Sequence, residues 1–494
     1  MKIANNELEA ICQREATMKL ALKACVYALP VMLGVQPAFA GLLTVGPNVN
    51  ITKLTGNQAE STISVNPTNT MNLFESDTIS NVGHYSVNGG LTWSTSNLSA
   101  LPSSIGNVQT GWDSFGNLFL TRFGPSLSIV VARSADGGAT FTDVRTVSAA
   151  NSNDQPSIAV GAHSVWVSFT NAANQIVATG ASVTGLGVVG AFGALQVAPG
   201  GGGDFGDIAI GPTGKVATVY QNNFSGPGPD TIKFNLDADG LGAGGFGAQS
   251  IVTATNVGGF RSITPQPNRS IDAEANLAWD TSGGAHNGRL YMVYVNAPST
   301  TSNDTDIFVR YSDDNGTTWS APVRVNDDAT TNSQFNPAIA VDETIGNVAV
   351  TWYDARNSPG DNTTQIFGTV SDNGGLSFLP NVQISTGTSN GSLVDSPFDY
   401  GDYDKMTFDN GMFWRSWADN SNSTGDNPNG TGALDIYTAK VTFTAVPEPS
   451  TWLLLATGGA VLFTTGWRRR KRNAGIQFSF LSRALPYRPR ASVA

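Results

Sequence analysis

Cysteine is almost absent from this 494-residue sequence, and its two cysteines, Cys12 and Cys25, both lie in the first 40 residues. If that segment is removed on export, the remaining chain has no thiol, which excludes a disulfide framework, a cysteine nucleophile and a cysteine metal site. The three histidines, His84, His163 and His286, are far apart in the sequence. We therefore expect no metal site built from clustered cysteine or histidine.

Charged residues are also scarce, at 13% of the sequence, and most of them are acidic. Residues 41–446 contain 15 Lys and Arg against 34 Asp and Glu, a net charge of −19. Such a surface repels phosphate, so we expect neither nucleic acid nor anionic lipid as a partner. An acidic body without thiols suits an extracellular or periplasmic protein, where calcium would be the natural ion. Residues 235–240 carry Asp237 and Asp239 but lack the closing glutamate of a calcium-binding loop, so no cofactor is predicted.

The N-terminal residues have the pattern of an export signal. From Met18 the chain carries lysines, then an apolar run over 24–35, then a small-x-small triplet that ends at Ala40. This order predicts a secretory signal peptide over residues 1–40, a helix that directs the chain to the Sec machinery and is cleaved after Ala40. Met18 is an alternative start, because residues 1–17 add little to the pattern.

The C-terminal residues combine three features in a fixed order. Pro447, Glu448 and Pro449 precede an apolar run over 451–467, and five basic residues, 468–472, follow. The run is short for a bilayer span, and a permanent tail anchor is one explanation. The order resembles more specifically the PEP-CTERM sorting signal of Gram-negative bacteria.

The PEP-CTERM resemblance implies a location and a partner. Residues 446–472 would hold a transmembrane helix that anchors the chain in the inner membrane. An exosortase would then process it, leaving the protein outside the cell or at its surface. Residues 473–494 continue past the point where such signals normally end, and no role is predicted for this tail.

Between the two ends, the sequence repeats a pair of short apolar runs separated by a turn. Residues 336–356 show the pattern most clearly, and six relatives begin at Ser61, Val108, Pro156, Gly206, Glu274 and Gly401. A third run follows each pair, and a fourth follows in several units, which are about 55–60 residues apart. Four antiparallel strands repeated in this way predict an all-β fold: a seven-bladed β-propeller over residues 41–445, with six blades as the alternative.

The last unit has only three strands, because its third strand, 435–443, runs into the C-terminal motif. Residues 43–53 look like a fourth strand that is followed by the first strand of the next unit. We therefore expect this N-terminal strand to pair beside residues 435–443 and to close the ring.

A nine-residue loop, such as SDDNGTTWS at 312–320, occurs four times between a third and a fourth strand. The Asp or Asn at its third position is expected to bond backbone N–H groups two residues on, and its aromatic residue to cover the turn against the blade. The loop resembles the Asp box, or BNR repeat, which implies a propeller and a structural role on the face opposite the binding site. Its predicted structural residues are Ser86, Asn88, Trp93, Ser134, Asp136, Phe141, Ser312, Asp314, Trp319, Ser371, Asn373 and Phe378.

If these loops occupy one face, the connections after second strands and before first strands form the other. Those connections are long, rich in Asp and Asn, and carry arginine and tyrosine. Arg356 is the strongest candidate, since a guanidinium beside Asp354 offers donors to a sugar or carboxylate, although an ion pair that only orders 353–365 explains it too. The ligand-binding candidates are Asp354, Arg356, Asp402, Tyr403, Asp419, Arg261 and Arg269.

Two classes of function remain. The resemblance to sialidases implies a carboxylated sugar held by three arginines, and a tyrosine nucleophile paired with glutamate. The early Arg-Ile-Pro motif of that family is absent, and no Tyr–Glu pair can be assigned, since Glu274 is the only glutamate in the right region. We favour a monomeric, non-catalytic propeller that binds an extracellular glycan or protein in an exopolysaccharide or biofilm setting. A sialidase-type exo-glycosidase is the alternative.

Overall fold

The computed structural model describes residues 40–446, apart from 104–105, 151–152, 201 and 223–225. The predicted signal peptide, the sorting motif with its membrane helix, and the C-terminal tail therefore lie outside the described residues. In the part of the chain that the structure describes, no helix is long and apolar enough to cross a membrane.

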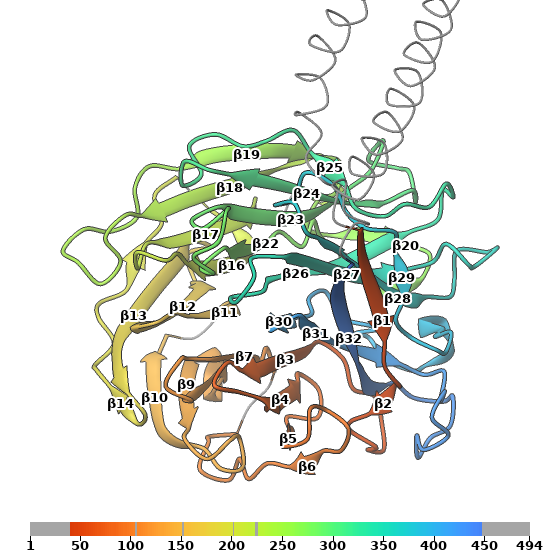
Figure 1. The fold of residues 1–494 in the computed structure, drawn as a ribbon, viewed down its shortest axis with the longest axis horizontal. Coiled ribbons are helices and arrows are strands. Elements are labelled where there is room, and N and C mark those ends of the chain that lie inside the picture. The colour runs from red at the N-terminus through yellow and green to blue at the C-terminus, as the bar shows by residue number, and fades with distance from the viewer. Residues whose placement is uncertain (1–39, 104–105, 151–152, 201, 223–225, 447–494) are drawn as a thin grey trace, which may run out of the picture. The chain divides into compact units, whose positions relative to one another are not determined.

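Seven antiparallel blades follow one another around a ring, each with its first strand innermost (Figure 1). Blade 1 consists of β3 (Ser61–Asn66), β4 (Asn69–Asp77), β5 (Gly83–Ser86) and β6 (Ser94–Thr95), and blade 2 of β7 (Gln109–Trp112), β8 (Leu118–Phe123), β9 (Ile129–Ser134) and β10 (Thr142–Ser148). Blade 3 consists of β11 (Asp154–Val160), β12 (Ser164–Thr170), β13 (Ile176–Gly185), β14 (Val188–Val189) and β15 (Gln196–Val197), and blade 4 of β16 (Asp204–Ile210), β17 (Val216–Gln221), β18 (Asp230–Asp237) and β19 (Ser250–Thr255). Blade 5 consists of β22 (Asn276–Trp279), β23 (Leu290–Asn296), β24 (Asp306–Ser312) and β25 (Val323–Arg324), and blade 6 of β26 (Gln334–Val341), β27 (Val348–Asp354), β28 (Gln365–Ser371) and β29 (Val382–Gln383). Blade 7 consists of β30 (Met406–Asp409), β31 (Met412–Asp419) and β32 (Asp435–Val446), completed by β1 (Ala40–Val45) and β2 (Val49–Asn50).

The ring closes as predicted, and the seven-blade count is confirmed over the six-blade alternative. β1 and β2 both pair with β32, and Val49 lies opposite Thr438. The N–H of Ile51 donates to the carbonyl of Ile436 at 2.8 Å, and Ile51 itself is buried. All seven blades are thus contained within residues 40–446.

The hydrophobic core lies between blades, which explains the apolar runs in the sequence. Every residue of β12 and of β27 is buried, because neighbouring blades cover both faces of these second strands. Strands buried on both faces have continuous apolar runs rather than a strict alternation. The turns between strands carry the glycines and asparagines.

Two features were not predicted. A two-stranded hairpin of β20 (Arg261–Ile263) and β21 (Gln266–Ile271) lies between blades 4 and 5, where we expected only a loop. The outer strand of blade 3 is split into β14 and β15, each two residues long and each paired with β13. The remaining short helical turns are η1 (Pro125–Leu127) and η2 (Gly391–Leu393).

The four nine-residue loops share one set of hydrogen bonds. In the copy at 312–320, the Ser312 hydroxyl accepts from Gly316 N at 2.8 Å, and Asp314 Oδ1 accepts from Thr318 N at 2.8 Å. The same two bonds recur in the other three copies at 2.8–3.1 Å. The Asp or Asn side chain therefore bonds the backbone N–H group four residues on. Our prediction that it would bond N–H groups two residues on is wrong. The serine hydroxyl takes the nearer N–H groups, which leaves the longer side chain to reach the far end of the loop.

The aromatic residues of these loops contact the preceding blade and not only their own turn. Trp319 of blade 5 packs edge-on against Phe234 of blade 4, with ring centroids 5.7 Å apart. Phe141 of blade 2 packs in the same way against Phe74 of blade 1 at 5.3 Å. The loops thus hold adjacent blades together, in agreement with the structural role that the Asp-box resemblance implies.

We expect Phe141→Ala to destabilise the propeller more than Trp319→Ala. Phe141 is fully buried, so its loss leaves a cavity worth about 3–5 kcal/mol, whereas Trp319 is only partly buried and should cost about 2–4 kcal/mol. Urea unfolding monitored by circular dichroism measures both. Leu376→Ala, at an exposed position of another copy of the loop, is the control and should change nothing. An unchanged midpoint for Phe141→Ala would contradict this role.

Candidate functional site

The predicted site and the nine-residue loops lie at opposite ends of the strands. Arg356 follows β27, the second strand of blade 6, whereas Trp319 lies between β24 and β25, the third and fourth strands of blade 5. In an antiparallel blade these two kinds of connection are on opposite faces. We call them the loop face, with Arg356, and the box face, with Trp319.

A bent backbone marks the loop-face end of the innermost strands. In each of the first six blades, one residue with a side chain has a positive φ, between 43° and 56°. This left-handed conformation is uncommon outside glycine, and here it turns the chain from the incoming loop into the central channel. The six residues are Glu60, Asn107, Gln155, Phe205, Glu274 and Asn336.

A small pocket of about 30 Å³ opens among these bends, and we call it the channel-mouth pocket. Two predicted site residues, Asp402 and Tyr403, line it. Glu274, weighed before only as a catalytic glutamate, also lines it. The full lining is Gln109, Gln155, Pro156, Ser157, Phe205, Gly206, Asp207, Asp272, Glu274, Ala275, Asn276, Asp402, Tyr403 and Lys405.

Several carboxyl groups of this region hold their protons unusually tightly. Burial, and then the charge of Asp402, raises the pKa of Asp272 well above its usual range. Burial, and then the charge of Asp272, also raises the pKa of Glu274 well above its usual range. Glu60 lies beside the pocket, and burial followed by the charge of Asp402 raises its pKa too. Burial and the neighbouring negative charges therefore disfavour the ionised forms of these carboxyl groups.

Two basic residues, Lys405 and Arg269, contact carboxyl groups in or beside the pocket. Lys405 Nζ lies 2.9 Å from Asp207 Oδ1 and donates to Asn276 Oδ1 at 2.6 Å. Arg269, a predicted site residue, forms an ion pair with Asp402, and its Nη2 lies 3.8 Å from a Glu60 oxygen. The structure thus brings together three of the predicted residues, Arg269, Asp402 and Tyr403, and their role in binding stays a prediction.

A tyrosine–glutamate pair is present that the sequence analysis did not find. The Tyr403 hydroxyl lies near the Glu60 carboxyl, donates to Asn107 Oδ1 at 3.0 Å and lies 3.0 Å from Thr78 Oγ1. Burial, and then the charge of Glu60, raises the pKa of Tyr403 well above its usual range. Glu60 and Tyr403 are more than 340 residues apart, so no local pattern pairs them.

The arginines do not converge over the channel. Arg261 is buried near the β20–β21 hairpin and donates to the carbonyls of Asn256, at 3.1 Å, and Ser302. Arg415 is buried between blades 6 and 7, and Arg356 lies at the junction of blades 5 and 6. Among the arginines that the structure describes, only Arg269 contacts a residue that lines the channel-mouth pocket, namely Asp402. A three-arginine clamp for a carboxylated sugar is therefore not formed there.

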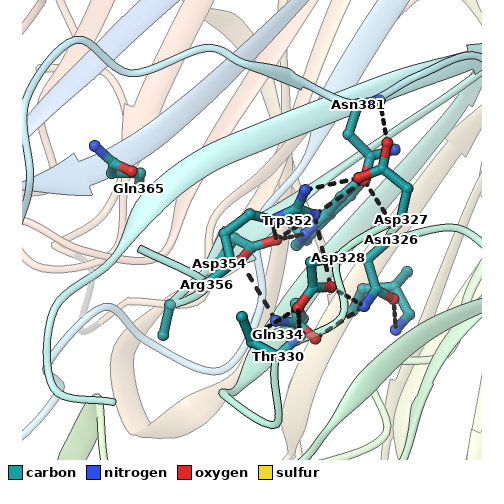
Figure 2. Close-up of polar contacts among 12 residues, drawn as sticks. Asn326, Asp327, Asp328, Thr330, Gln334, Trp352, Asp354, Arg356, Gln365 and Asn381 are labelled. Carbon is teal, nitrogen blue, oxygen red and sulfur yellow. Dashed lines mark hydrogen bonds and ion pairs between the residues drawn. The ribbon is translucent and has the colours of Figure 1, made fainter. Parts of the chain in front are cut away.

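Arg356 sits in a dense polar cluster of its own, which Figure 2 shows. Its Nε donates to Asp354 Oδ2 at 2.9 Å, and its Nη1 lies 2.7 Å from Asp327 Oδ1. Its Nη2 donates to Asn381 Oδ1 at 2.9 Å, and the guanidinium lies over the Phe367 ring at 4.2 Å. These contacts tie the loop after β27 to the connection between blades 5 and 6.

Asp354 and Asp419 occupy equivalent positions in blades 6 and 7. Trp352 Nε1 donates to Asp354 Oδ2 at 2.7 Å, and Trp417 Nε1 donates to Asp419 Oδ2 at 3.1 Å. Their other oxygens accept backbone N–H groups two residues on, as in Asx turns. Both side chains are buried, so turn chemistry accounts for this recurring residue, and a ligand role stays a prediction.

The structure holds no group of three or more His, Cys, Asp or Glu side chains arranged to bind a metal, within the residues it describes. In the loop once weighed for calcium, Asp237 Oδ1 accepts the N–H groups of Asp239, at 3.1 Å, and Gly240, at 2.9 Å. That is the pattern of an Asx turn.

We expect the protein to be more stable at pH 5 than at pH 8. Burial raises the pKa of Asp77 to about 7, and those of Asp204, Asp404 and Asp435 to about 6. The unfolded value is about 4, so the folded state binds more protons between pH 4 and 7, and stability falls as the pH rises through that range. Urea unfolding should show a loss of at least about 2 kcal/mol from pH 5 to pH 8.

The variant Asp77→Asn tests this assignment. Asparagine keeps the acceptor that bonds the N–H groups of Ile79 and Ser80, at 3.0 and 2.7 Å, but does not titrate. The loss of stability between pH 5 and pH 8 should therefore shrink. A pH dependence of the opposite sign in the parent protein would contradict the prediction.

Family comparisons agree with two parts of the sequence analysis. The PEP-CTERM protein-sorting motif matches residues 445–471, nearly the predicted 446–472. The BNR/Asp-box repeat matches residues 310–321, one of the four loops. No curated protein matches the chain.

Solved structures resemble the chain at low sequence identity. A protein of unknown function from Dyadobacter fermentans is 11% identical, with 81% of this chain and 99% of that one covered, at a TM-score of 0.44. An α-L-arabinofuranosidase from Fusarium graminearum, solved with an iminosugar inhibitor, is 14% identical over 81% and 98%, at 0.41. A Trypanosoma rangeli sialidase in complex with the inhibitor DANA is 12% identical over 71% and 56%, at 0.40. The chain is a seven-bladed β-propeller that carries the BNR/Asp-box repeat and the PEP-CTERM motif, which implies export and sorting to the cell surface.

Proposed function

We propose that this propeller binds an extracellular glycan at the channel-mouth pocket and does not hydrolyse it. The observation that carries the proposal is the pocket itself. It gathers carboxyl, amide and hydroxyl groups at the axis of the ring, where strands from several blades converge. Concave sites with a few convergent polar groups are the usual candidates for ligand binding, and this one has room for a single group of a larger ligand.

The direction of β32 supports an accessible pocket. β32 is the third strand of blade 7, so it ends on the box face at Val446. Near that end, Phe443 N donates to the carbonyl of Gly411 at 2.8 Å, in the hairpin between β30 and β31. The last described residues of β32 therefore lie on the face opposite the pocket.

The separated arginines favour binding without sialidase chemistry. Recognition of a carboxylated sugar would need several guanidinium groups in one place, and only Arg269 is near the pocket. Arg269 is already paired with Asp402. A sugar with hydroxyl or amine groups suits the carboxyl-rich lining better, because carboxylates accept hydrogen bonds.

Hydrolysis is the second candidate, and one observation favours it. Burial and neighbouring negative charge raise the pKa values of Asp272 and Glu274, and a raised carboxyl pKa is what a general acid requires. The Tyr403–Glu60 pair would be the nucleophile of a sialidase-type exo-glycosidase. Against this, the raised pKa of Tyr403 keeps its hydroxyl protonated and weakly nucleophilic.

Binding of residues 41–446 to a glycan array, with fluorogenic glycosides assayed in parallel, tests both candidates. We expect binding without turnover, weakened by Tyr403→Phe in the pocket and unchanged by Leu376→Ala on the box face. Turnover that Glu274→Gln removes would establish the hydrolase instead. Failure to bind any glycan would refute the proposed function.

Arg356→Ala separates a ligand role from a structural one. We expect a folded protein with unchanged glycan affinity, because the guanidinium is engaged within the protein and does not line the channel-mouth pocket. Its removal leaves the buried carboxyl group of Asp354 without its cation, although Trp352 still donates to Oδ2, and this should cost about 1–3 kcal/mol of stability in urea unfolding. A tenfold loss of affinity would assign Arg356 to the ligand.

A further inference from the structure

Phe260 is an aromatic residue with a large exposed surface. It lies on the loop face, in the connection between β19 and β20, and is 46% exposed. The other aromatic side chains in the part of the chain that the structure describes are buried or partly buried. A single exposed apolar residue needs no explanation by itself, so the place of Phe260 on the surface decides what it means.

Phe260 borders the channel-mouth pocket through one other ring. It packs edge-on against Phe205, with ring centroids 5.6 Å apart, and Phe205 lines the pocket. Phe205 is also one of the bent residues at the start of the innermost strands, with a φ of 53°. The exposed ring of Phe260 therefore lies one ring away from the mouth of the pocket.

The backbone holds Phe260 in this place. Its N–H donates to the carbonyl of Gly226 at 3.0 Å, and the next residue, Arg261, is buried. Gly259 precedes it, and a methyl group there would lie 2.3 Å from a ring carbon of Phe205. A side chain at 259 would thus force Phe205 to move, whereas glycine lets the connection approach it closely. The ring is positioned before any ligand binds, which lowers the cost of binding.

The small pocket leaves most of any glycan outside it. With room for a single group, the pocket can take one substituent of one sugar, and the neighbouring ring must then lie on the loop face. We infer that Phe260 stacks on that neighbouring ring, and that the ligand is a neutral glycan whose pyranose rings carry equatorial hydroxyl groups. This inference rests on the proposed function and names its ligand class.

The ligand class follows from the chemistry of an aromatic ring on an acidic protein. A pyranose with equatorial hydroxyl groups presents axial C–H groups on its two faces, and these pack on the electron-rich face of an aromatic ring. An axial hydroxyl group places an oxygen on one of those faces. A carboxylated sugar is repelled by a chain whose residues 41–446 have a net charge of −19.

The first test uses calorimetry on residues 41–446 with three hexasaccharides: cellohexaose, β-1,4-linked mannohexaose and α-1,4-linked galacturonate. We expect cellohexaose to bind at least about threefold more tightly than mannohexaose, which has axial 2-hydroxyl groups, and at least about tenfold more tightly than the charged galacturonate. Equal or tighter binding of either competitor would overturn the ligand class.

Variants of Phe260 locate the effect. Phe260→Ala should weaken cellohexaose binding about tenfold, and Phe260→Trp should keep or increase the affinity. Phe260→Leu keeps apolar bulk against Phe205 but removes the aromatic face, so it should weaken binding nearly as much and decides the matter if Phe260→Ala fails to fold. Ile251→Ala is the control, because Ile251 is 63% exposed in β19 of the same blade, and it should change nothing.

Saturation transfer in NMR distinguishes stacking from a structural role of Phe260. Irradiation of the aromatic protons of the parent protein should saturate the axial protons on one face of a glucose ring more than the protons at C6. Phe260→Leu should lose this pattern. Even saturation of all sugar protons in the parent would contradict stacking.

Failure of the inference and failure of the proposed function give different results. Parent affinity in folded Phe260→Ala and Phe260→Leu proteins would overturn the inference, and glycan binding that Tyr403→Phe weakens would still stand. Binding of other glycans on the array, with none of the three hexasaccharides bound, would overturn the ligand class alone. Absence of binding by all three probes and on the array would overturn both.

Discussion

Excision of residues 41–55 is expected to lower the stability of the whole ring by about 5 kcal/mol or more. The segment supplies β1 and β2, which cover the edge of β32. It buries Ile51, and a fully buried side chain of this size contributes about 1.5–3 kcal/mol; Leu43 and Val45, which are partly buried, pack against the core and add less. The cut also exposes an unpaired edge and removes the partner of the buried Asp435.

Urea unfolding followed by tryptophan fluorescence measures this effect. A synthetic peptide spanning residues 40–55, added in trans, should restore part of the lost stability because it can re-form the pairing with β32. Leu42→Ser, at a position 57% exposed within β1, is the control and should leave unfolding nearly unchanged. A truncated protein that unfolds at the parent urea concentration would show that the closure is not needed.

The repeat architecture was predictable because its signals are local. Each second strand is an apolar run bounded by Gly, Asn or Asp, and each nine-residue loop carries its own serine, Asp or Asn, glycine and aromatic residue. Even the closing strand was predictable, since residues 43–53 repeat the pattern that precedes other first strands.

The outer parts of the blades were predicted less well. The split outer strand of blade 3 falls in a glycine-rich stretch, 185–203, which has no alternation to indicate where pairing begins. The β20–β21 hairpin contains Pro265, Pro267 and Asn268, which favour turns, so its sequence indicates a loop. Edge strands pair on one side only, and their sequences are therefore weakly constrained.

The site was predictable only in part. Asp402 and Tyr403 were identified from their loop, and both line the pocket, with Arg269 paired to Asp402. The other four predicted residues lie in other clusters of the loop face: Arg261, Asp354, Arg356 and Asp419. Glu60 was missed, because it belongs to blade 1 and lies beside a pocket lined by residues of blades 2 to 5 and 7, which no sequence spacing relates. One weak signal existed: an acidic or amide residue recurs just before many first strands.

The buried ion pair between Arg415 and Asp404 joins three blades. Both side chains are fully buried, with Arg415 Nη2 2.9 Å from Asp404 Oδ2. Arg415 also donates to Thr351 Oγ1 at 3.2 Å and to the carbonyl of Asn336 at 3.0 Å, both in blade 6. Asp404 accepts from the N–H of Ser61 at 3.1 Å, in blade 1. The pair therefore lies where the closing blade meets both of its neighbours.

Arg415→Met is expected to destabilise the propeller by about 3–5 kcal/mol at pH 8, because it leaves a buried carboxylate without its cation. Burial raises the pKa of Asp404 to about 6 even though Arg415 lowers it, so without Arg415 the pKa should rise further. At pH 5 Asp404 would then be protonated and neutral, and the loss of stability should be smaller than at pH 8. Adding Asp404→Asn to Arg415→Met removes the unpaired charge, keeps an acceptor for Ser61, and should recover part of the stability at pH 8. Urea unfolding of the parent and both variants at the two pH values provides the measurement. An equal loss at pH 5 and pH 8 would mean that Arg415 stabilises the ring by packing, and not by pairing with Asp404.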